Sequence, residues 1–585
     1  MPPENGASPE KRPNYGRKFS DRMTETSRAD IAWRRISEGK SSKKEEKTEA
    51  GERGSSVWEK IVTRFRENYC PDRSPPLILP SAPTDGEKYS YLDMNRKFLL
   101  TCASLALLAL TVGSWMFAKA SPIFCWFAVY IFLSQLYLYV SLFITFLGKK
   151  FDLASHKSVL TDNPLTAAED APSVDIYLPV CKEPREILEN TWEHVAALDY
   201  PATQLSVYVL DDGVSEDVKS LAARFGFTYI CRPNRPELKK AGNIRYAFTQ
   251  TSGAFYVVFD ADFCPRADFL TETVPYMKAD SRLALLQTPQ FFRSLPTQTW
   301  TEQGAGACQE YIFRVLQPCR DRYGASMCVG SNAIYRRAAF ESVGGSIGVD
   351  CSEDLYTGFW AATHGWSVKY MPLVLACGVC PDVPRAFFAQ QVRWCTGSMT
   401  LHLSREFWSS SLSAKQKVCY LIGFMYNIFS AVNIFLAPLP APLILWTKPE
   451  LFKYYNLFFA FPTLLMGLVA LRIWTKGRYT FAVQYAETVM TYAYLQSILD
   501  YIRGKHLAWM PSRREGKVHG NKRYTNMRIL AWIWTITHQA ALIAACVYRV
   551  VGGMPWYHLV PALVIDVYFL LCLHRFLLYK HAKKA

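Results

Sequence analysis

Two pairs of acidic residues follow apolar runs of β-forming residues, where carboxylates from neighbouring strands could meet. Asp260-Ala261-Asp262 comes after the run 255–259, and Asp211-Asp212-Gly213 comes after the run 207–210. Carboxylates at positions i and i+2 can bind a nucleotide and a divalent cation such as Mg²⁺ or Mn²⁺ together. Each pair alone is equally compatible with a solvated turn, for example an Asp-Gly turn. Two such pairs at the ends of successive strands favour a binding site.

Two further segments combine residue types that transfer of a sugar from a nucleotide would require. Ser352-Glu353-Asp354 precedes a helical stretch, and Asp354 could take a proton from an attacking hydroxyl. As a structural alternative, Ser352 is a plausible N-cap and the acidic residues suit the first turn. Gln390-Gln391-Val392-Arg393-Trp394 offers a guanidinium fork for a diphosphate and a flat ring for a sugar. An interfacial Arg/Trp anchor is the alternative there.

The segment 150–410 must position these residues, and its composition is that of a soluble domain. We expect strands over five short runs: 174–181, 206–212, 227–232, 255–260 and 283–287. Helical stretches, including 184–198 and 215–225, alternate with them. This alternation predicts an α/β domain with a mostly parallel sheet and helices on its faces. Ligands in such domains bind at the carboxyl ends of strands, where both acidic pairs lie.

Six other segments are apolar runs: 98–118, 123–147, 418–446, 454–471, 529–548 and 557–579. A helix needs roughly 20 apolar residues to cross a bilayer, so we expect six transmembrane helices. Two lie in 98–149 and four in 411–585. The last contains Asp566, which could line a polar pore or pair with a neighbouring helix.

The apolar stretch 480–501 differs because its polar residues fall on one helical face: Gln484, Glu487, Thr488 and Thr491. This pattern predicts a helix that lies in the membrane interface. The loop 502–527 that follows is rich in Lys and Arg. This assignment places four segments on the cytosolic side, as the positive-inside rule requires: the polar and largely disordered tail 1–97, the domain 150–410, this loop and the C-terminus.

The composition agrees with a membrane protein. Of 585 residues 50% are hydrophobic, and the net charge of +16 is explained by the cytosolic loops without a nucleic-acid partner. The sixteen cysteines are irregularly spaced, and the C-x-x-C of Cys377 and Cys380 has no second pair. We therefore expect reduced cysteines rather than a zinc site or a disulfide framework.

In their order, the four motifs resemble the cellulose synthase superfamily of processive family-2 glycosyltransferases, whose pattern is D, D-x-D, T-E-D and Q-x-x-R-W. The resemblance covers about 174–447. Three further segments match the family: Lys240-Ala241-Gly242-Asn243, Gln287-Thr288-Pro289-Gln290-Phe291-Phe292 and Phe435-Leu436-Ala437-Pro438-Leu439. The resemblance implies an α/β GT-A glycosyltransferase domain inserted in an α-helical transmembrane channel domain with interfacial helices.

The resemblance also implies a role for each matched residue. Asp354 would be the catalytic general base, and Asp260 with Asp262 would hold Mg²⁺ or Mn²⁺. The residues that contact the UDP donor would be Glu183, Asp211, Asp212, Lys240 and Asp260. The residues that bind the diphosphate and the acceptor end of the polymer would be Gln390, Gln391, Arg393 and Trp394. The loop 502–527 would be a gate over the active site.

The chain departs from the family pattern at several positions. An aromatic residue near the uracil is missing from Pro179-Val180-Cys181-Lys182-Glu183-Pro184, and Ser352 replaces the threonine of T-E-D. Met327-Cys328-Val329 replaces an aromatic pair ahead of Gly330-Ser331, in a segment that places the acceptor. The gate motif has only a loose counterpart in 517–522.

These features predict an enzyme that polymerises glucose from UDP-glucose into a mixed β-1,3/1,4-glucan or a β-1,4-glucan and moves it across the membrane. A synthase of another β-linked polymer, such as hyaluronan or chitin, is the first alternative, and a catalytically inactive secretion channel is the second. We expect UDP-glucose, the growing glucan and membrane lipids as partners. We further expect a multi-pass plasma-membrane protein with a cytosolic catalytic domain; the motifs indicate no oligomeric state.

Overall fold

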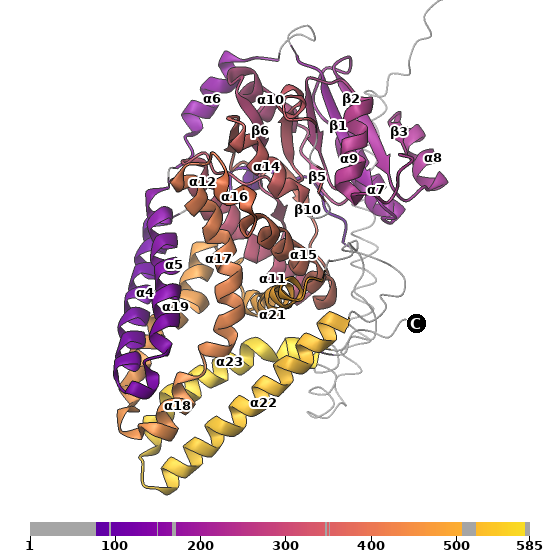
Figure 1. Ribbon diagram of the computed structural model, residues 1–585. Coiled ribbons are helices and arrows are strands. Elements are labelled where there is room, and N and C mark those ends of the chain that lie inside the picture. Colours follow the sequence, from indigo (N-terminus) through magenta and orange to yellow (C-terminus); the bar gives the residue numbers. More distant parts are fainter. Residues whose placement is uncertain are drawn as a thin grey trace, which may run out of the picture. The chain divides into compact units, whose positions relative to one another are not determined.

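The computed structural model describes residues 69, 78–92, 95–148, 150–165, 171–345, 348–349, 352–505 and 522–579 (Figure 1). Most of the expected N-terminal tail lies outside the described residues, as does most of the expected gate, including 517–521. Residues 75–579 form one compact unit. Within it, an α/β region carries the sequence motifs and a helical region carries the apolar runs.

A seven-stranded mixed sheet with the order β3-β2-β1-β4-β8-β6-β9 forms the centre of the α/β region. Its strands are β1 (Val174–Val180), β2 (Leu205–Asp211), β3 (Thr228–Ile230), β4 (Phe255–Val258), β6 (Leu283–Gln287), β8 (Ala333–Arg336) and β9 (Ser367–Tyr370). The pairs among β1, β2, β3 and β4 are parallel, whereas β8 runs antiparallel to β4 and β6. All five expected strands are present with ends within two residues of the prediction. The mostly parallel sheet is confirmed, with β8 as its exception.

Helices cover both faces of this sheet, and the alternation of side chains along β1 shows why. Ile176 and Leu178 are buried in a cluster that includes Leu188 of α7 (Arg185–Ala196). Tyr177, which points to the opposite face, is buried with Phe248 of α9 (Lys239–Gln250). Both faces of the sheet are therefore apolar, as expected for strands that are covered on two sides.

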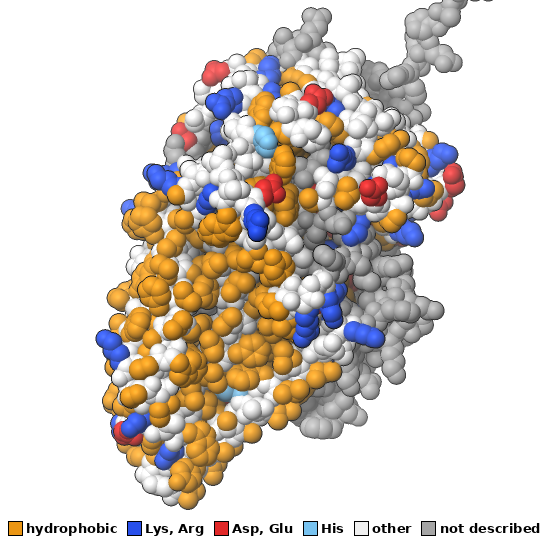
Figure 2. Space-filling view, in the orientation of Figure 1, with side chains coloured by type: hydrophobic (Ala, Val, Ile, Leu, Met, Phe, Trp, Pro, Cys, Tyr) orange, Lys and Arg blue, Asp and Glu red, His pale blue; other side chains and the backbone are white. Residues whose placement is uncertain are grey.

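In the described part of the chain, six helical segments are long and apolar enough to span a membrane, which agrees with the expected number by length and composition. They comprise α4 (Arg96–Lys119), α5 (Phe127–Leu147), α17 (Ala414–Leu436) with α18 (Pro440–Thr447), α19 (Leu457–Leu465) through α20 (Leu471–Trp474), α22 (Lys522–Val551), and α23 (Val560–Leu578). Figure 2 shows hydrophobic side chains gathered over these helices, whereas charged side chains gather mainly on the α/β region. The chain is a multi-pass membrane protein.

Helix α21 (Ala482–Ile502) forms where a helix was expected over 480–501. It packs against α11 (Trp300–Tyr311) and α15 (Pro384–His402) of the α/β region and against α17 and α23 of the helical region. Gln484 and Thr488 of the polar stripe are each 5% exposed. Gln484 and Thr488 therefore face other protein groups, whereas Glu487 and Thr491 of the same stripe are partly exposed.

Residues 78–92 are ordered and packed, although they fall within the tail 1–97 that was expected to be largely disordered. A capping box between Thr84 and Glu87 starts the short helix α3 (Asp85–Lys88). Lys88 Nζ lies 2.7 Å from a carboxylate oxygen of Asp268 and 2.5 Å from one of Glu272. We call this segment the N-terminal strap. Its ion pairs and buried Tyr91 fix it to the α/β region, which composition alone could not reveal.

Candidate active site

The turn after β2 contains two carboxylates, and the oxygens of both accept hydrogen bonds from protein groups. Asp211 is fully buried, and both of its oxygens accept hydrogen bonds: from Gly213 N at 2.6 Å, and from Ser215 N and the Tyr229 hydroxyl at 2.9 Å each. It therefore shapes the turn. Its expected role in donor binding stays a prediction, and sequence spacing alone does not show that this carboxylate is buried.

Asp212 points to the other side of this turn and forms a bidentate ion pair with Arg232. Both N–O distances are 2.8 Å, and the Arg232 side chain is fully buried. The glycine of the 240–243 motif makes this pair possible, because a Cβ on Gly242 would lie 2.3 Å from Arg232 Nη1. Sequence reasoning missed Arg232, since only its position after β3 distinguishes it from other arginines.

Lys240 and Asp260 form the next ion pair, between the start of α9 and the end of β4. Lys240 Nζ lies 2.5 Å from Asp260 Oδ1, 3.2 Å from the Gly330 carbonyl oxygen and 3.9 Å from Glu353 Oε1. Burial would lower the pKa of Lys240, but the charges of Asp260, Glu353 and Asp354 raise it above its usual value. Lys240 therefore stays positively charged between two of the predicted motifs.

The loop 329–332 joins the Asp260 turn to Asp354. The Ser331 hydroxyl accepts a hydrogen bond from Asp260 N at 3.0 Å. Gln287, from the segment 287–292, holds the loop through bonds from its Nε2 to the Ser331 carbonyl oxygen at 2.8 Å and from Val329 N to its Oε1 at 2.9 Å. Gly330 has a φ of +79°, and a Cβ there would lie 3.0 Å from Asp354 Cβ. Glycine is needed because the loop backbone lies directly against the Asp354 side chain.

Asp354 begins α14 (Glu353–Thr363), and its Oδ1 accepts a hydrogen bond from Leu355 N at 2.8 Å. Burial, and then the neighbouring charge of Glu353, raise the pKa of Asp354 to about 7. A carboxylate with this pKa can accept a proton near neutral pH. Ser352 is the N-cap residue of α14, but its backbone is left-handed (φ +56°) and its side chain makes no capping hydrogen bond, whereas typical N-cap residues are extended.

Helix α15 carries the 390–394 motif, and its next turn contacts the residue that precedes α14. This contact places the motif near Asp354. A Cβ on Gly397 would lie 1.8 Å from Ser352 Oγ, so α15 packs directly against the residue that precedes α14. Gln390, Arg393 and Gly397 share one helical face by their spacing, and Trp394 beside them is 39% exposed. These side chains therefore lie on the side of α15 that meets the Asp354 region.

Gln391 lies apart from the other residues of its motif. It is 1% exposed, and its Oε1 accepts a hydrogen bond from the Tyr494 hydroxyl of α21 at 3.3 Å. The expectation that Gln391 binds the substrate stays a prediction. Its position next to Gln390 in the sequence puts it about 100° around the helix, on the face that packs on α21.

Glu183 lies next to the acidic turns at the carboxyl end of β1. Its Oε2 accepts a hydrogen bond from Cys181 N at 2.5 Å. Burial raises the pKa of Glu183, and the charges of Asp260 and Asp211 add to that effect. The structure therefore brings Glu183 into the same acidic region as the expected donor-binding residues.

The side chains of the Asp260 turn suit a hard divalent cation. Asp260 and Asp262 supply only oxygen ligands, which Mg²⁺ and Mn²⁺ prefer. Across the described ranges, no group of three or more His, Cys, Asp or Glu side chains could hold a metal ion. A site with two carboxylates fits Mg²⁺, which usually takes its remaining ligands from substrate phosphates and water.

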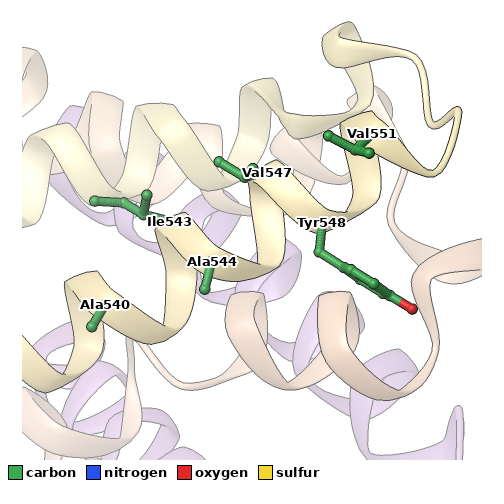
Figure 3. A pocket seen from close by; sticks show the side chains of 6 residues that line it. All are labelled: Ala540, Ile543, Ala544, Val547, Tyr548 and Val551. Atoms are coloured by element: carbon green, nitrogen blue, oxygen red, sulfur yellow. The ribbon is translucent and has the colours of Figure 1, made fainter.

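The pocket in Figure 3 is a different feature, on the outward face of α22. Its lining is almost entirely apolar: Ala540, Ile543, Ala544, Val547, Tyr548 and Val551. These residues recur at helical spacing along one candidate span. They include no group that could bind a diphosphate, so the cluster around Lys240 and Asp354 is the candidate active site.

Residues 175–344 match the model of the family described as Glycosyl transferase family 2. The chain is 30% identical over 410 residues to Cellulose synthase 2 of Novacetimonas hansenii, covering 68% of this chain and 25% of that protein. It is 31% identical over 402 residues to the UDP-forming Cellulose synthase 1 catalytic subunit of Komagataeibacter xylinus, covering 66% of this chain and 52% of that protein. The chain thus spans between a quarter and a half of the length of these relatives.

Among solved structures, the chain is similar to the mannosyltransferase PcManGT from Pyrobaculum calidifontis, in complex with GDP-Man and Mn²⁺. The identity is 18%, the TM-score is 0.44, and the match covers 65% of this chain and 99% of that one. The family match and the mixed sheet between two sets of membrane helices confirm the expected fold class, a GT-A domain inserted in a transmembrane helical domain.

Proposed function

We propose that this chain, which carries a family 2 glycosyltransferase domain of the cellulose synthase superfamily, is an inverting and processive synthase of a β-glucan from UDP-glucose. The observation that carries the proposal is the convergence of Lys240, Asp260 and Asp354 on the loop 329–332. Three motifs that are far apart in the sequence meet there at one sheet edge. The UDP-forming relatives support UDP as the leaving group.

In this reaction Asp354 would take the proton of an acceptor hydroxyl. The hydroxyl oxygen forms a bond to the anomeric carbon of the donor, while the bond from that carbon to the diphosphate oxygen breaks and its electron pair leaves with UDP. Attack from the side opposite the leaving group inverts the anomeric centre. The pKa of about 7 suits Asp354 to this task, because a base is most effective when its pKa lies near the working pH.

The remaining residues would bind and orient the substrates. Lys240 supplies positive charge beside the leaving diphosphate, and Asp212 is oriented by Arg232 toward the nucleotide side of the turn. Asp260 and Asp262 would hold Mg²⁺ or Mn²⁺, which when bound neutralises diphosphate charge. Arg393 would contact the diphosphate, and the half-exposed ring of Trp394 would support the acceptor sugar.

For the product, we propose a mixed β-1,3/1,4-glucan or a β-1,4-glucan. The support for an altered linkage is the segment 327–329, whose residues lack the aromatic pair expected beside Gly330. We further propose that the catalytic domain is cytosolic and that the helical domain passes the glucan across the plasma membrane.

The test is to incubate membranes that contain the full chain with labelled UDP-glucose, UDP-N-acetylglucosamine or UDP-glucuronate, and to digest the product with linkage-specific hydrolases. Incorporation from UDP-glucose into a product that β-glucanases degrade is expected. Incorporation from another donor would instead favour a chitin- or hyaluronan-type synthase. The Asp354→Asn variant should bind UDP but form no polymer; an unchanged yield would show that the base lies elsewhere.

A further inference from the structure

Three elements meet at the last turn of α5, where α4 and α12 (Gln317–Asp321) contact its backbone. A Cβ on Gly148, the residue after α5, would lie 2.3 Å from Cys319 Sγ of α12 and 2.7 Å from Arg96 Nη2 of α4. Glycine is needed here because any side chain would collide with both neighbours. The end of α5 is therefore a junction between the first two membrane helices and the α/β region.

Two guanidinium groups bind the end of α5. Arg96 donates hydrogen bonds to the carbonyl oxygens of Thr145 and Gly148. Arg322, directly after α12, donates one to the carbonyl oxygen of Leu147. The last carbonyl oxygens of a helix have no backbone donors from a following turn, so the two arginines cap α5. Because these carbonyl groups carry no net charge, both guanidinium groups keep their full positive charge.

Carboxylates do not balance these charges in the described part of the chain. Residues 96–151 contain no Asp or Glu. Asp152 and Asp321, which flank the junction in the sequence, are bound elsewhere. Asp152 accepts a hydrogen bond from Ala154 N at 3.0 Å, and Asp321 accepts one from Tyr370 N at 2.7 Å. No ion pair among the described residues involves either arginine. The junction is therefore a place of uncompensated positive charge.

Exposed lysines extend this charge toward the membrane surface. Lys97 follows the arginine of α4, Lys150 follows the junction by two residues, and both side chains are exposed, as is that of Arg322. Phe143 and Phe146, in the last turn of α5, are 62% and 66% exposed, as expected for side chains of a membrane span that face lipid. Figure 2 shows Lys and Arg side chains along the border between the hydrophobic surface and the α/β region. We call the four basic residues around the end of α5 the basic corner: Arg96, Lys97, Lys150 and Arg322.

We propose that the basic corner binds the phosphate of an anionic phospholipid, in the leaflet on the side of the α/β region. The acyl chains of this lipid lie along Phe143 and Phe146, which a free phosphate ion would leave uncovered. Basic residues at the ends of spans are common. The corner differs from them because the helix end already orients two guanidinium groups, so less side-chain entropy is lost when the phosphate binds.

The first test uses the parental full chain in nanodiscs of phosphatidylcholine, with or without phosphatidylglycerol. Acylation of the Lys97 and Lys150 amines by an N-hydroxysuccinimide ester is located and timed by mass spectrometry. With phosphatidylglycerol both amines should react about fivefold more slowly, the factor expected for one basic side chain at an anionic bilayer surface. Lys415, an exposed lysine at the start of α17, reports the general effect of the charged bilayer and should be slowed less.

The second test measures phosphatidylglycerol binding to the purified full chain in detergent by native mass spectrometry. The corner variant combines Lys97→Gln, Lys150→Gln and Arg322→Gln, and it keeps Arg96, which caps α5 at two carbonyl groups. At about fivefold for each basic side chain, it should bind phosphatidylglycerol about 100-fold more weakly. The charge-keeping variant combines Lys97→Arg, Lys150→Arg and Arg322→Lys and should bind with the parental affinity.

A matched control removes the same charge at the same end of other helices, from α16 (Arg405–Ser409), α17 and α20. It combines three substitutions of exposed residues: Arg405→Gln, Lys415→Gln and Arg472→Gln. This control variant should also bind with the parental affinity. An equal loss in the control variant would overturn the inference, since total charge would then explain the effect.

Parental affinity in the corner variant would also overturn the inference. So would an equal loss in the charge-keeping variant, because the side chains would then act through the local structure rather than through their charge. If inorganic phosphate, added to phosphatidylcholine nanodiscs, slows acylation of Lys97 and Lys150 as much as phosphatidylglycerol does, the corner binds a free anion and the lipid assignment is wrong. None of these measurements requires polymer synthesis, so their outcome is independent of the proposed function.

Discussion

The contact between Gly397 of α15 and Ser352 before α14 gives the sharpest test of how the site is assembled. In the Gly397→Ala variant the new Cβ would lie 1.8 Å from Ser352 Oγ and 2.3 Å from Ser352 Cβ. Ordinary contacts begin near 3.4 Å, so one element must move by roughly 1.5 Å. A displacement of about 1 Å at a catalytic group can reduce the rate about 100-fold, and overpacking costs about 1–3 kcal/mol of stability.

The matched rescue is the double variant Ser352→Gly with Gly397→Ala. Removing the serine side chain leaves Ser352 Cα as the nearest atom of that residue, at 3.5 Å, which is an ordinary contact. Glycine also suits the left-handed backbone at position 352, and alanine favours a helix over glycine by about 1 kcal/mol. We therefore expect the double variant to recover most of the transfer rate and of the thermal stability.

The assay is the initial rate of labelled glucose transfer from UDP-glucose in membranes, together with the midpoint of thermal unfolding of the purified protein. Both are measured for the parental chain, Gly397→Ala, Ser352→Gly and the double variant. These four proteins form a double-mutant cycle whose coupling term should be large and favourable. If Gly397→Ala keeps the parental rate, or if the double variant is no better than that single variant, then α15 does not position Asp354 through this contact.

Three further predictions follow from the site. Because Asp354 must be ionised to act as a base and its pKa is about 7, the transfer rate should rise as the pH increases through about 7. The Glu353→Gln variant removes a negative charge that raises this pKa, so the midpoint of its rate–pH curve should lie at lower pH. An unchanged midpoint would contradict the assignment of Asp354 as the base. Asp211→Ala should lower the free energy of unfolding by about 2–4 kcal/mol, since three donors lose their acceptor, and a variant of parental stability with weaker UDP binding would identify Asp211 as a donor ligand. Trp394→Ala should slow chain elongation more than it weakens UDP binding, and parental elongation by the purified variant would exclude Trp394 as an acceptor platform.

The sequence identified most of the acidic positions at the site because they depend on local patterns. An apolar run followed by a carboxylate places Asp212 and Asp260 at strand ends whatever the rest of the chain does. Their partners could not be found in this way. Arg232 and Ser331 act through contacts with residues 20 and 71 positions away, and these contacts follow from the packing of α9 and of the loop 329–332.

The sequence also did not predict the direction in which each side chain of a motif points. Gln390 and Gln391 are adjacent and chemically identical, yet one lies on the face toward α14 and the other is buried against α21. The polar stripe of α21 predicted a helix but not its packing partners, because a helix that packs on other parts of the protein has the same periodicity as one at a membrane surface.

The N-terminal strap has a mechanical consequence for the first pair of membrane helices. Lys88, shortly before α4, and His156, in α6 (Leu153–Asp162) after α5, both bind the Glu272 carboxylate, at 2.5 Å and 2.8 Å. The hairpin formed by α4 and α5 is therefore anchored at both of its ends to one side chain of α10 (Phe269–Ala279). A change in the tilt of this hairpin, for example in a thinner bilayer, would be transmitted through these two contacts to α10 and to the sheet on which it packs. The thickness of the bilayer would thereby affect the catalytic domain.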